Sequence, residues 1–435
     1  MITPIKPARL AMLLTMLVIF VTGCQRDQLT DFNAASVEQD PIFNEITDVP
    51  QMREAESYLL DESTVLRRRY VTFDSAQMER ALGNGNEVLL NLFNDYEVTA
   101  YTTNLRSEEG VQTLSGEVAG AEYSRVSLSF AGDQMMGMVH TDDRIFRIMP
   151  LGDGSHVIAE VFQSNFVDGD CQQIEEVEHD HDANDPGHST HKVGSTTIKV
   201  LLVLPANGMS IWCSNSIFKN LLKAQAKASL DDTWGGYSAN VTIYCSSYNY
   251  NGDASTDLNW LKNDATIASV RASRNADLVC MFQPTMTGVI DGQTVSICGY
   301  AQTPSSVSAS TSDKCHSIVK FSCAFDNYSF PHEIGHNLGM YHDRYVMSNY
   351  GTDTRCGYGY VQSYFGLGSG RSIMAYNTYC SDGGGNCTRM GFFSQGAAPL
   401  ITGIPCGQPL GTGLLRPADN WSQLEDAFPY VSAYN

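Results

Sequence analysis

The alternation of apolar and polar residues divides the chain into two regions with different rhythms. From about residue 56, short apolar or alternating runs are separated by turns that contain Gly and Asp, which is the pattern of antiparallel strands. We therefore predict a β-rich region, arranged as an antiparallel meander or a small sandwich. The runs that predict its strands cover residues 87–93, 97–101, 124–130, 135–140 and 144–148.

From Val193 onwards the pattern is that of an α/β domain. Residues 197–204 are almost continuously apolar, which is typical of a strand in a sheet covered on both faces. A helix over about 214–230 follows, where apolar residues recur at helical spacing. We predict further strands at 241–245, 276–282, 295–301 and 317–322, a helical segment at 256–275, and a closing helix over about 419–428 that Pro429 stops.

One short motif in the second region contains residues that can bind a metal ion and act on a water molecule. His332 and His336 are four residues apart, so on a helix both imidazoles leave the same face and can bind one metal ion. Glu333 lies beside the first histidine and can reach a water on that metal. Gly339 can take the left-handed conformation that ends a helix, and the resulting turn would bring His342 back as a third ligand.

Three neutral imidazoles and a water molecule form an open tetrahedral zinc site, which is the catalytic type. In such a site the ion activates the water and polarises a carbonyl, while Glu333 accepts the proton of the water. The two histidines with their glutamate would occur by chance in about one chain in a hundred of this size, and the added Gly339 and His342 make chance far rarer. We therefore predict one catalytic Zn²⁺.

This stretch resembles the signature of the metzincin metalloproteases, and Asp343 after the third histidine resembles the reprolysin (adamalysin) branch. The resemblance implies a catalytic domain with a mixed five-stranded twisted sheet, a zinc-binding helix and a methionine turn, and Met374 within 372–376 fits that turn. Pro331 departs from the reprolysin pattern, and the helix must begin within a turn of it, capped by Ser329. Tyr376 is typical of the astacin and serralysin branches, where it ligates zinc or steadies the transition state; a packed turn tyrosine is the alternative.

The same resemblance assigns a role to an edge strand before the motif. In the family an extended substrate adds to an antiparallel edge strand through main-chain hydrogen bonds. This role falls on Gly299, Tyr300 and Ala301, which fit an ordinary edge strand equally well. The β-rich region itself is similar to the prodomain that precedes reprolysin catalytic domains, with an unrelated β domain as the alternative.

The N-terminus has the features of an export signal. Lys6 and Arg9 precede an apolar stretch at 10–21, which is shorter than a membrane-spanning helix needs. The residues that end at Cys24 resemble a bacterial lipoprotein box, in which that cysteine is lipidated; an ordinary secretory signal is the alternative. We expect an exported protein, an outer-membrane lipoprotein precursor whose catalytic domain can be released outside the cell.

The net charge of the chain limits the classes of partner that it is expected to bind. The formal net charge of -21 disfavours nucleic acid or an anionic membrane as a partner. Proteins or peptides are the expected substrates, membrane attachment is expected only through the N-terminal lipid, and we expect a monomer.

The cysteines and one acidic segment complete the domain plan. Ten of the twelve cysteines lie between Cys213 and Cys406, and a dense, even set in an exported domain implies disulfides. Residues 171–192 are acidic, histidine-rich and almost free of apolar residues, which indicates an exposed linker where a protease could cut. The predicted plan is a signal peptide with lipobox at 1–24, a β-rich prodomain at 25–170, the linker at 171–192, and the catalytic domain at 193–435.

The sequence also contains a candidate for the group that keeps the enzyme latent. Cys171 is left without a partner by the cysteine count, and a thiolate held over the cleft would displace the water from zinc. Reprolysins use such a cysteine switch, although their usual flanking residues are absent here, and Asp170 is the rival candidate because astacins use an aspartate. We therefore predict a latent zinc endopeptidase. The alternatives are a peptidyl-Asp-type enzyme that cuts before acidic residues, and an inactive, metal-stabilised surface-binding lipoprotein.

Overall fold

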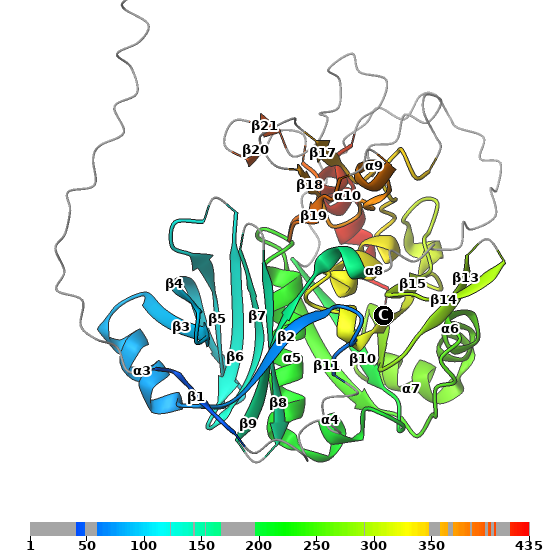
Figure 1. Cartoon of the computed structure of the whole chain (residues 1–435). Coiled ribbons are helices and arrows are strands. Elements are labelled where there is room, and N and C mark those ends of the chain that lie inside the picture. The colour runs from blue at the N-terminus through cyan, green and yellow to red at the C-terminus, as the bar shows by residue number, and fades with distance from the viewer. Residues whose placement is uncertain are drawn as a thin grey trace, which may run out of the picture. The chain divides into compact units, whose positions relative to one another are not determined.

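Two sheets contain most of the strands in this computed structural model (Figure 1). Residues 41–435 form one unit. The predictions for Cys24, Asp170, Cys171 and the linker at 171–192 lie outside the described residues. Those are 41–47, 59–121, 123–141, 144–152, 154–166, 196–290, 292–347, 357–363, 369–382, 385–395, 399–401, 404–405 and 418–434.

The first sheet has nine strands in the order β1-β2-β9-β8-β7-β6-β5-β4-β3, and every neighbouring pair is antiparallel. Strands β3 to β9 follow one another as a meander, so the β-rich N-terminal region exists and forms one sheet rather than a sandwich. The sequence pattern missed β1, β2, β5 and β9, and also α3 (Ser75–Asn84), whose N-cap Asp74 accepts from the Gln77 amide. The strands are β1 (Phe43–Glu45), β2 (Val65–Phe73), β3 (Glu87–Phe93), β4 (Tyr96–Glu108), β5 (Val111–Val118), β6 (Arg125–Ala131), β7 (Gln134–His140), β8 (Ile145–Gly152) and β9 (Ser155–Val161).

The second sheet has five strands in the order β11-β10-β12-β16-β15. The first four are parallel, and β15 (Gly299–Ala301) pairs antiparallel with β16 at the edge. The single strand predicted at 295–301 was wrong, because its first residues belong to a separate hairpin of β13 (Thr287–Ile290) and β14 (Gln293–Ser296). The other strands are β10 (Thr197–Leu204), β11 (Ser238–Cys245), β12 (Leu278–Gln283) and β16 (His316–Lys320).

The helices differ from the predicted spans where capping residues set their ends. The predicted segment 256–275 is two helices, because the Asp264 side chain accepts from the Thr266 and Ile267 amides and begins a new helix there. Pro429 does not stop the last helix, since it lies inside the final turn of α10. The helices of this region are α4 (Ser210–Ser214), α5 (Ser216–Asp231), α6 (Ala254–Asn263), α7 (Ala265–Ser273), α8 (Ser329–Asn337), α9 (Thr378–Asp382) and α10 (Asn420–Val431).

Helix α5 lies between the two sheets (Figure 1). Its apolar residues Leu221 and Leu222 belong to one buried cluster with Met136 and Met138 of β7. Buried polar contacts accompany this packing, since the Gln225 amide donates to Ser127 Oγ at 3.0 Å. The two regions therefore share a core through α5.

A buried ion pair also joins the two regions. Arg147 of β8 meets Asp326 at 2.5 Å, and both side chains are at most 4% exposed. Arg147 also donates to the carbonyl oxygens of Leu59 and Ser322. Burial raises the pKa of Asp326, against the opposing effect of Arg147. Two charges in such a site are tolerated only while each has its partner.

Three disulfides are formed among the described residues: Cys213–Cys245, Cys298–Cys323 and Cys380–Cys387. Cys280 and Cys315 are buried free thiols, so the even set is not fully paired in this part of the chain. Cys323 bonds Cys298 rather than its sequence neighbour Cys315. No helix among the described residues is long and apolar enough to cross a membrane.

We predict that Arg147→Ala lowers the free energy of unfolding by about 3–5 kcal/mol, because it leaves the Asp326 carboxylate buried without its cation. The control is Arg68→Ala, which breaks an ion pair with the exposed Glu62 and should cost about 1 kcal/mol or less. Urea unfolding measures both. Equal losses in the two variants would contradict the importance assigned to the buried pair.

Candidate active site

Helix α8 places two of the predicted ligands on one face. It runs from Ser329 to Asn337, with Tyr328 as N-cap at φ 53°. The predicted cap was wrong, because Ser329 is the first helical residue. Pro331 is accommodated because the amide groups of the first turn have no acceptor within the helix.

The turn after α8 brings the third histidine back to the helix. Gly339 has φ +78°, a left-handed conformation that favours glycine. The Met340 amide then donates to the Gly335 carbonyl at 3.0 Å, which fixes the reversal. His342 follows three residues after Gly339 and lies against His332 and His336.

The three imidazoles converge through their Nε2 atoms, which lie 3.0 to 3.3 Å from one another. His332 Nδ1 is 2.8 Å from the Ile373 carbonyl and His336 Nδ1 is 2.9 Å from the Met340 carbonyl. Since a carbonyl only accepts, these Nδ1 atoms carry the protons and their Nε2 lone pairs face inward. Lone pairs this close repel unless a cation lies among them, and zinc–nitrogen bonds of about 2.1 Å in tetrahedral geometry place such nitrogens about 3.4 Å apart. The residues therefore fit a divalent metal ion.

The surroundings keep this cluster neutral. Burial lowers the pKa of His336 to about 4 and lowers those of His332 and His342 well below 6.5. The positive charge of Arg389 adds to the lowering at all three. Neutral imidazole is the form that ligates a metal, so the site is prepared for binding near neutral pH.

Glu333 is buried beside the cluster and next to the edge strand. A Cβ added at Gly299 would collide with the Glu333 carboxylate, so glycine is required there for the strand to approach the carboxylate. A small pocket is bounded by Glu333, His332, Gly299 and Tyr376. The carboxylate therefore borders the space where a substrate would lie.

Asp343 ties the third histidine to the turn that contains Met374. Its carboxylate accepts from the Tyr376 amide at 2.9 Å and from the Tyr345 amide at 3.1 Å. The Tyr376 ring lies 4.0 Å from the His342 ring between centroids. Met374 lies under α8, where a Cβ at Gly335 would come within 2.6 Å of its sulfur.

The structure thus brings together the predicted residues of the motif, the turn and the edge strand. Tyr300 and Ala301 extend the edge strand beyond Gly299. Sequence reasoning missed Arg389, which is 2% exposed and borders the same pocket. No local signal marks it, because it lies 47 residues after His342 in a region of Gly-rich loops.

The family model and the curated relatives that this chain matches are metallopeptidases. Residues 238–408 match the family model Reprolysin_4, described as metallo-peptidase family M12B, reprolysin-like. The chain is 27% identical over 327 residues to a peptidyl-Asp metalloendopeptidase of Stenotrophomonas maltophilia (strain R551-3), which covers 71% of this chain and 70% of that protein. A protein of the same name from Xanthomonas campestris pv. campestris is 27% identical over 315 residues, covering 70% and 68%. The crystal structure of metalloproteinase-II from Bacteroides fragilis overlaps with a TM-score of 0.37 at 10% identity, over 62% of this chain and 86% of that chain.

The class of protein follows from these matches and the histidine cluster: the chain is a metalloendopeptidase. The predicted resemblance to reprolysin-like metallopeptidases, with the bacterial peptidyl-Asp group among its relatives, is confirmed. The α/β fold with a β-rich N-terminal region is confirmed at the level of the mixed sheet and its helices.

We predict that Asp343→Ala weakens zinc binding about 10- to 100-fold, because groups that position metal ligands have effects of this size. The change frees the turn that carries His342 from its bond to Tyr376. The control is Asp382→Ala, whose carboxylate accepts from the exposed Tyr345 hydroxyl. Competition with a fluorescent chelator measures the affinities, and unchanged binding in Asp343→Ala would refute this positioning role.

Proposed function

We propose that the protein is an exported, zinc-dependent endopeptidase made as a latent precursor. His332, His336 and His342 would hold the ion, and Glu333 would act as general base. The observation that carries this proposal is the convergence of three buried Nε2 atoms with a buried carboxylate beside them.

A bound zinc ion would lower the pKa of a water molecule and polarise the peptide carbonyl. Glu333 would take up the proton of the attacking water and would return it to the peptide nitrogen as the carbon–nitrogen bond breaks. The products are a carboxylate and an amine. Tyr376 borders the same pocket, and its phenolic hydroxyl would donate a hydrogen bond to the carbonyl oxygen.

The edge strand would position the substrate. β15 lies at the edge of the described sheet, where it pairs with β16, and an extended peptide would bind there as a further strand. Gly299 lies at the level of Glu333. A peptide added antiparallel to β15 would therefore pass directly over the carboxylate.

A second candidate function is that of a peptidase that cuts before acidic residues. It is favoured by the names of the relatives and by the cation Arg389, which borders the pocket. An inactive, metal-stabilised binding lipoprotein is disfavoured, because a purely structural metal site has no use for Glu333 next to the ligands. We also propose that Cys24 is lipidated and that cleavage in 171–192 releases a soluble domain that begins near residue 193.

We predict that Glu333→Ala keeps its zinc and loses peptide cleavage by several orders of magnitude, because the proton acceptor is removed and the ligands remain. Glu425→Ala, an exposed carboxylate on α10, is the matched control and should cleave like the unmodified protein. Metal analysis and a casein-type substrate give the two readouts. Retained cleavage in Glu333→Ala would contradict the assignment of Glu333 as the general base.

We predict that Cys171→Ser raises the activity of the uncleaved protein, because the proposed thiolate ligand over the open zinc position is removed. Asp170→Asn is the companion variant for the rival switch. Cleavage of casein by uncut protein is compared for both, and unchanged latency in Cys171→Ser would remove the cysteine switch.

A further inference from the structure

Asn337 is the last residue of α8 and directly follows His336. It is fully buried, at 0% exposure. Asparagine is a poor helix former, and a buried amide loses its hydrogen bonds to water, so neither helix stability nor apolar packing favours this residue here. The reason for its presence must therefore lie in the bonds that its side chain makes.

The side-chain amide of Asn337 is bonded to three backbone carbonyls. Its Nδ2 donates to the carbonyls of Gln302 at 2.8 Å, His316 at 3.1 Å and Lys314 at 3.3 Å. Gln302 directly follows β15, and its own amide donates to the His316 carbonyl at 3.0 Å. Asn337 therefore holds the end of the β15–β16 pair against the end of the helix.

The helix and the edge strand meet at two separate points. Glu333 and Asn337 are four residues apart, so both lie on one face of α8. Glu333 approaches the strand at Gly299, where an added Cβ would collide with its carboxylate, and Asn337 contacts it at Gln302. These points are about 6 Å apart along the helix and about 10 Å apart along the strand. Together they fix both the distance and the angle between the helix and the strand.

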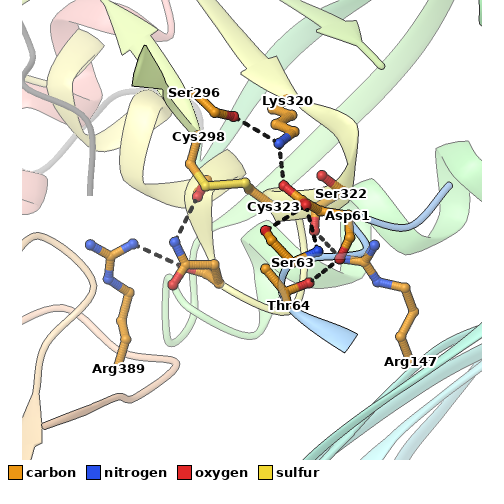
Figure 2. The surroundings of a disulfide bond; sticks show 12 residues. Asp61, Ser63, Thr64, Arg147, Ser296, Cys298, Lys320, Ser322, Cys323 and Arg389 are labelled. Carbon is orange, nitrogen blue, oxygen red and sulfur yellow. Dashed lines mark hydrogen bonds and ion pairs between the residues drawn. A yellow bond between two sulfur atoms is a disulfide. The ribbon is translucent and has the colours of Figure 1, made fainter. Parts of the chain in front are cut away.

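The other end of the edge strand is fixed by a covalent bond. Cys298, directly before β15, forms a disulfide with Cys323, which ends the short helix η3 (Phe321–Cys323) that precedes α8 (Figure 2). The Lys320 amide also donates to the Cys298 carbonyl at 2.9 Å. Asn337 is thus the counterpart of the disulfide at the far end of the strand.

The placement of this strand matters for the proposed chemistry. A peptide that adds to β15 would take its position from the strand, whereas Glu333 takes its position from α8. A displacement of about 1 Å between reacting groups can cost about 100-fold in rate. The contact between helix and strand would therefore decide how well the scissile carbonyl meets the carboxylate.

We propose that Asn337 is a positioning residue for peptide cleavage, which holds the substrate-binding edge strand in place against the helix that carries Glu333. Because it is buried behind the strand contact, it acts through β15 and touches neither the substrate nor the metal. This inference rests on the proposed endopeptidase function and adds the residue that links substrate binding to the position of the general base.

The test compares Asn337→Ala with the unmodified active enzyme on two peptides that contain the same scissile bond. The long peptide extends several residues on either side of that bond and can add to β15 as a strand, whereas the short peptide cannot. Since binding of remote substrate residues raises kcat, the unmodified enzyme should favour the long peptide by about 100-fold in kcat/KM. In Asn337→Ala we expect this ratio to fall about 10-fold or more, mostly through kcat of the long peptide, because the peptide still binds but is misplaced.

Asn207→Ala is the matched control. Asn207 also donates through Nδ2 to a carbonyl of a distant segment, that of Tyr250 at 3.0 Å, but it lies in the loop after β10. This variant should keep the ratio of long to short peptide. Zinc content and urea unfolding are measured for each variant, so that a loss of metal or of folding is recognised.

The outcomes separate positioning from mere support of the fold. Equal losses on both peptides in Asn337→Ala, or an unchanged ratio, would overturn the proposal. An unmodified enzyme that cleaves the two peptides equally well would also overturn it and leave the endopeptidase function standing, whereas activity in Glu333→Ala would overturn the function itself.

A second variant keeps the test decisive if Asn337→Ala does not fold. Asn337→Ser retains one donor in a smaller side chain, and it should lower the ratio less than the loss of both donors does. Hydrogen–deuterium exchange gives an independent readout, because the Gln302 amide should exchange faster in this variant than in Asn207→Ala. Unchanged exchange at Gln302 together with an unchanged ratio in Asn337→Ser would overturn the positioning role.

Discussion

The meeting of three buried imidazole nitrogens is the constraint on which the remaining structure depends. Two of the rings are held from behind, because His332 and His336 each have a backbone carbonyl at Nδ1. The third ring, that of His342, is placed by the left-handed turn at Gly339 and by the hydrogen bond that the Tyr376 amide donates to the Asp343 carboxylate. A cluster of lone pairs arranged in this way is stable only with a cation at its centre, so the fold and the metal site support each other.

The two sheets contribute different parts of this arrangement. The mixed sheet supplies the edge strand and carries α8, whereas the antiparallel sheet packs on α5 and reaches the site through single polar residues. Arg147, Gln163 and Asp61 each contact the loops around the Cys298–Cys323 disulfide or the strand of Arg389. The N-terminal region therefore takes part in positioning the walls of the site as well as in covering α5.

Local patterns in the sequence were sufficient for features whose causes are local. The spacing of His332, His336 and His342 around Gly339 predicted their convergence, because a helix and one left-handed residue determine it. The ends of helices were less predictable. Helix α10 extends past Pro429, which was expected to stop it. Tyr328 is the N-cap of α8, a position that favours smaller residues. The pairing of Cys323 with Cys298 follows from the adjacency of β15 and β16, which no spacing of cysteines reveals. Arg389 lies at the site because β19 (Thr388–Arg389) pairs with β18 (Ser369–Arg371) and because its guanidinium donates to the Asn327 and Ala375 carbonyls, and no local pattern in the sequence marks these contacts.

The measurement that tests the central claim most directly is zinc X-ray absorption on the purified full-length protein with its metal content determined in parallel. The account predicts one zinc per chain, with three imidazole nitrogens at about 2.0–2.1 Å in its first shell, and the loss of one of those nitrogens in His342→Ala. A protein without stoichiometric zinc, or with a first shell that His342→Ala leaves unchanged, would contradict it.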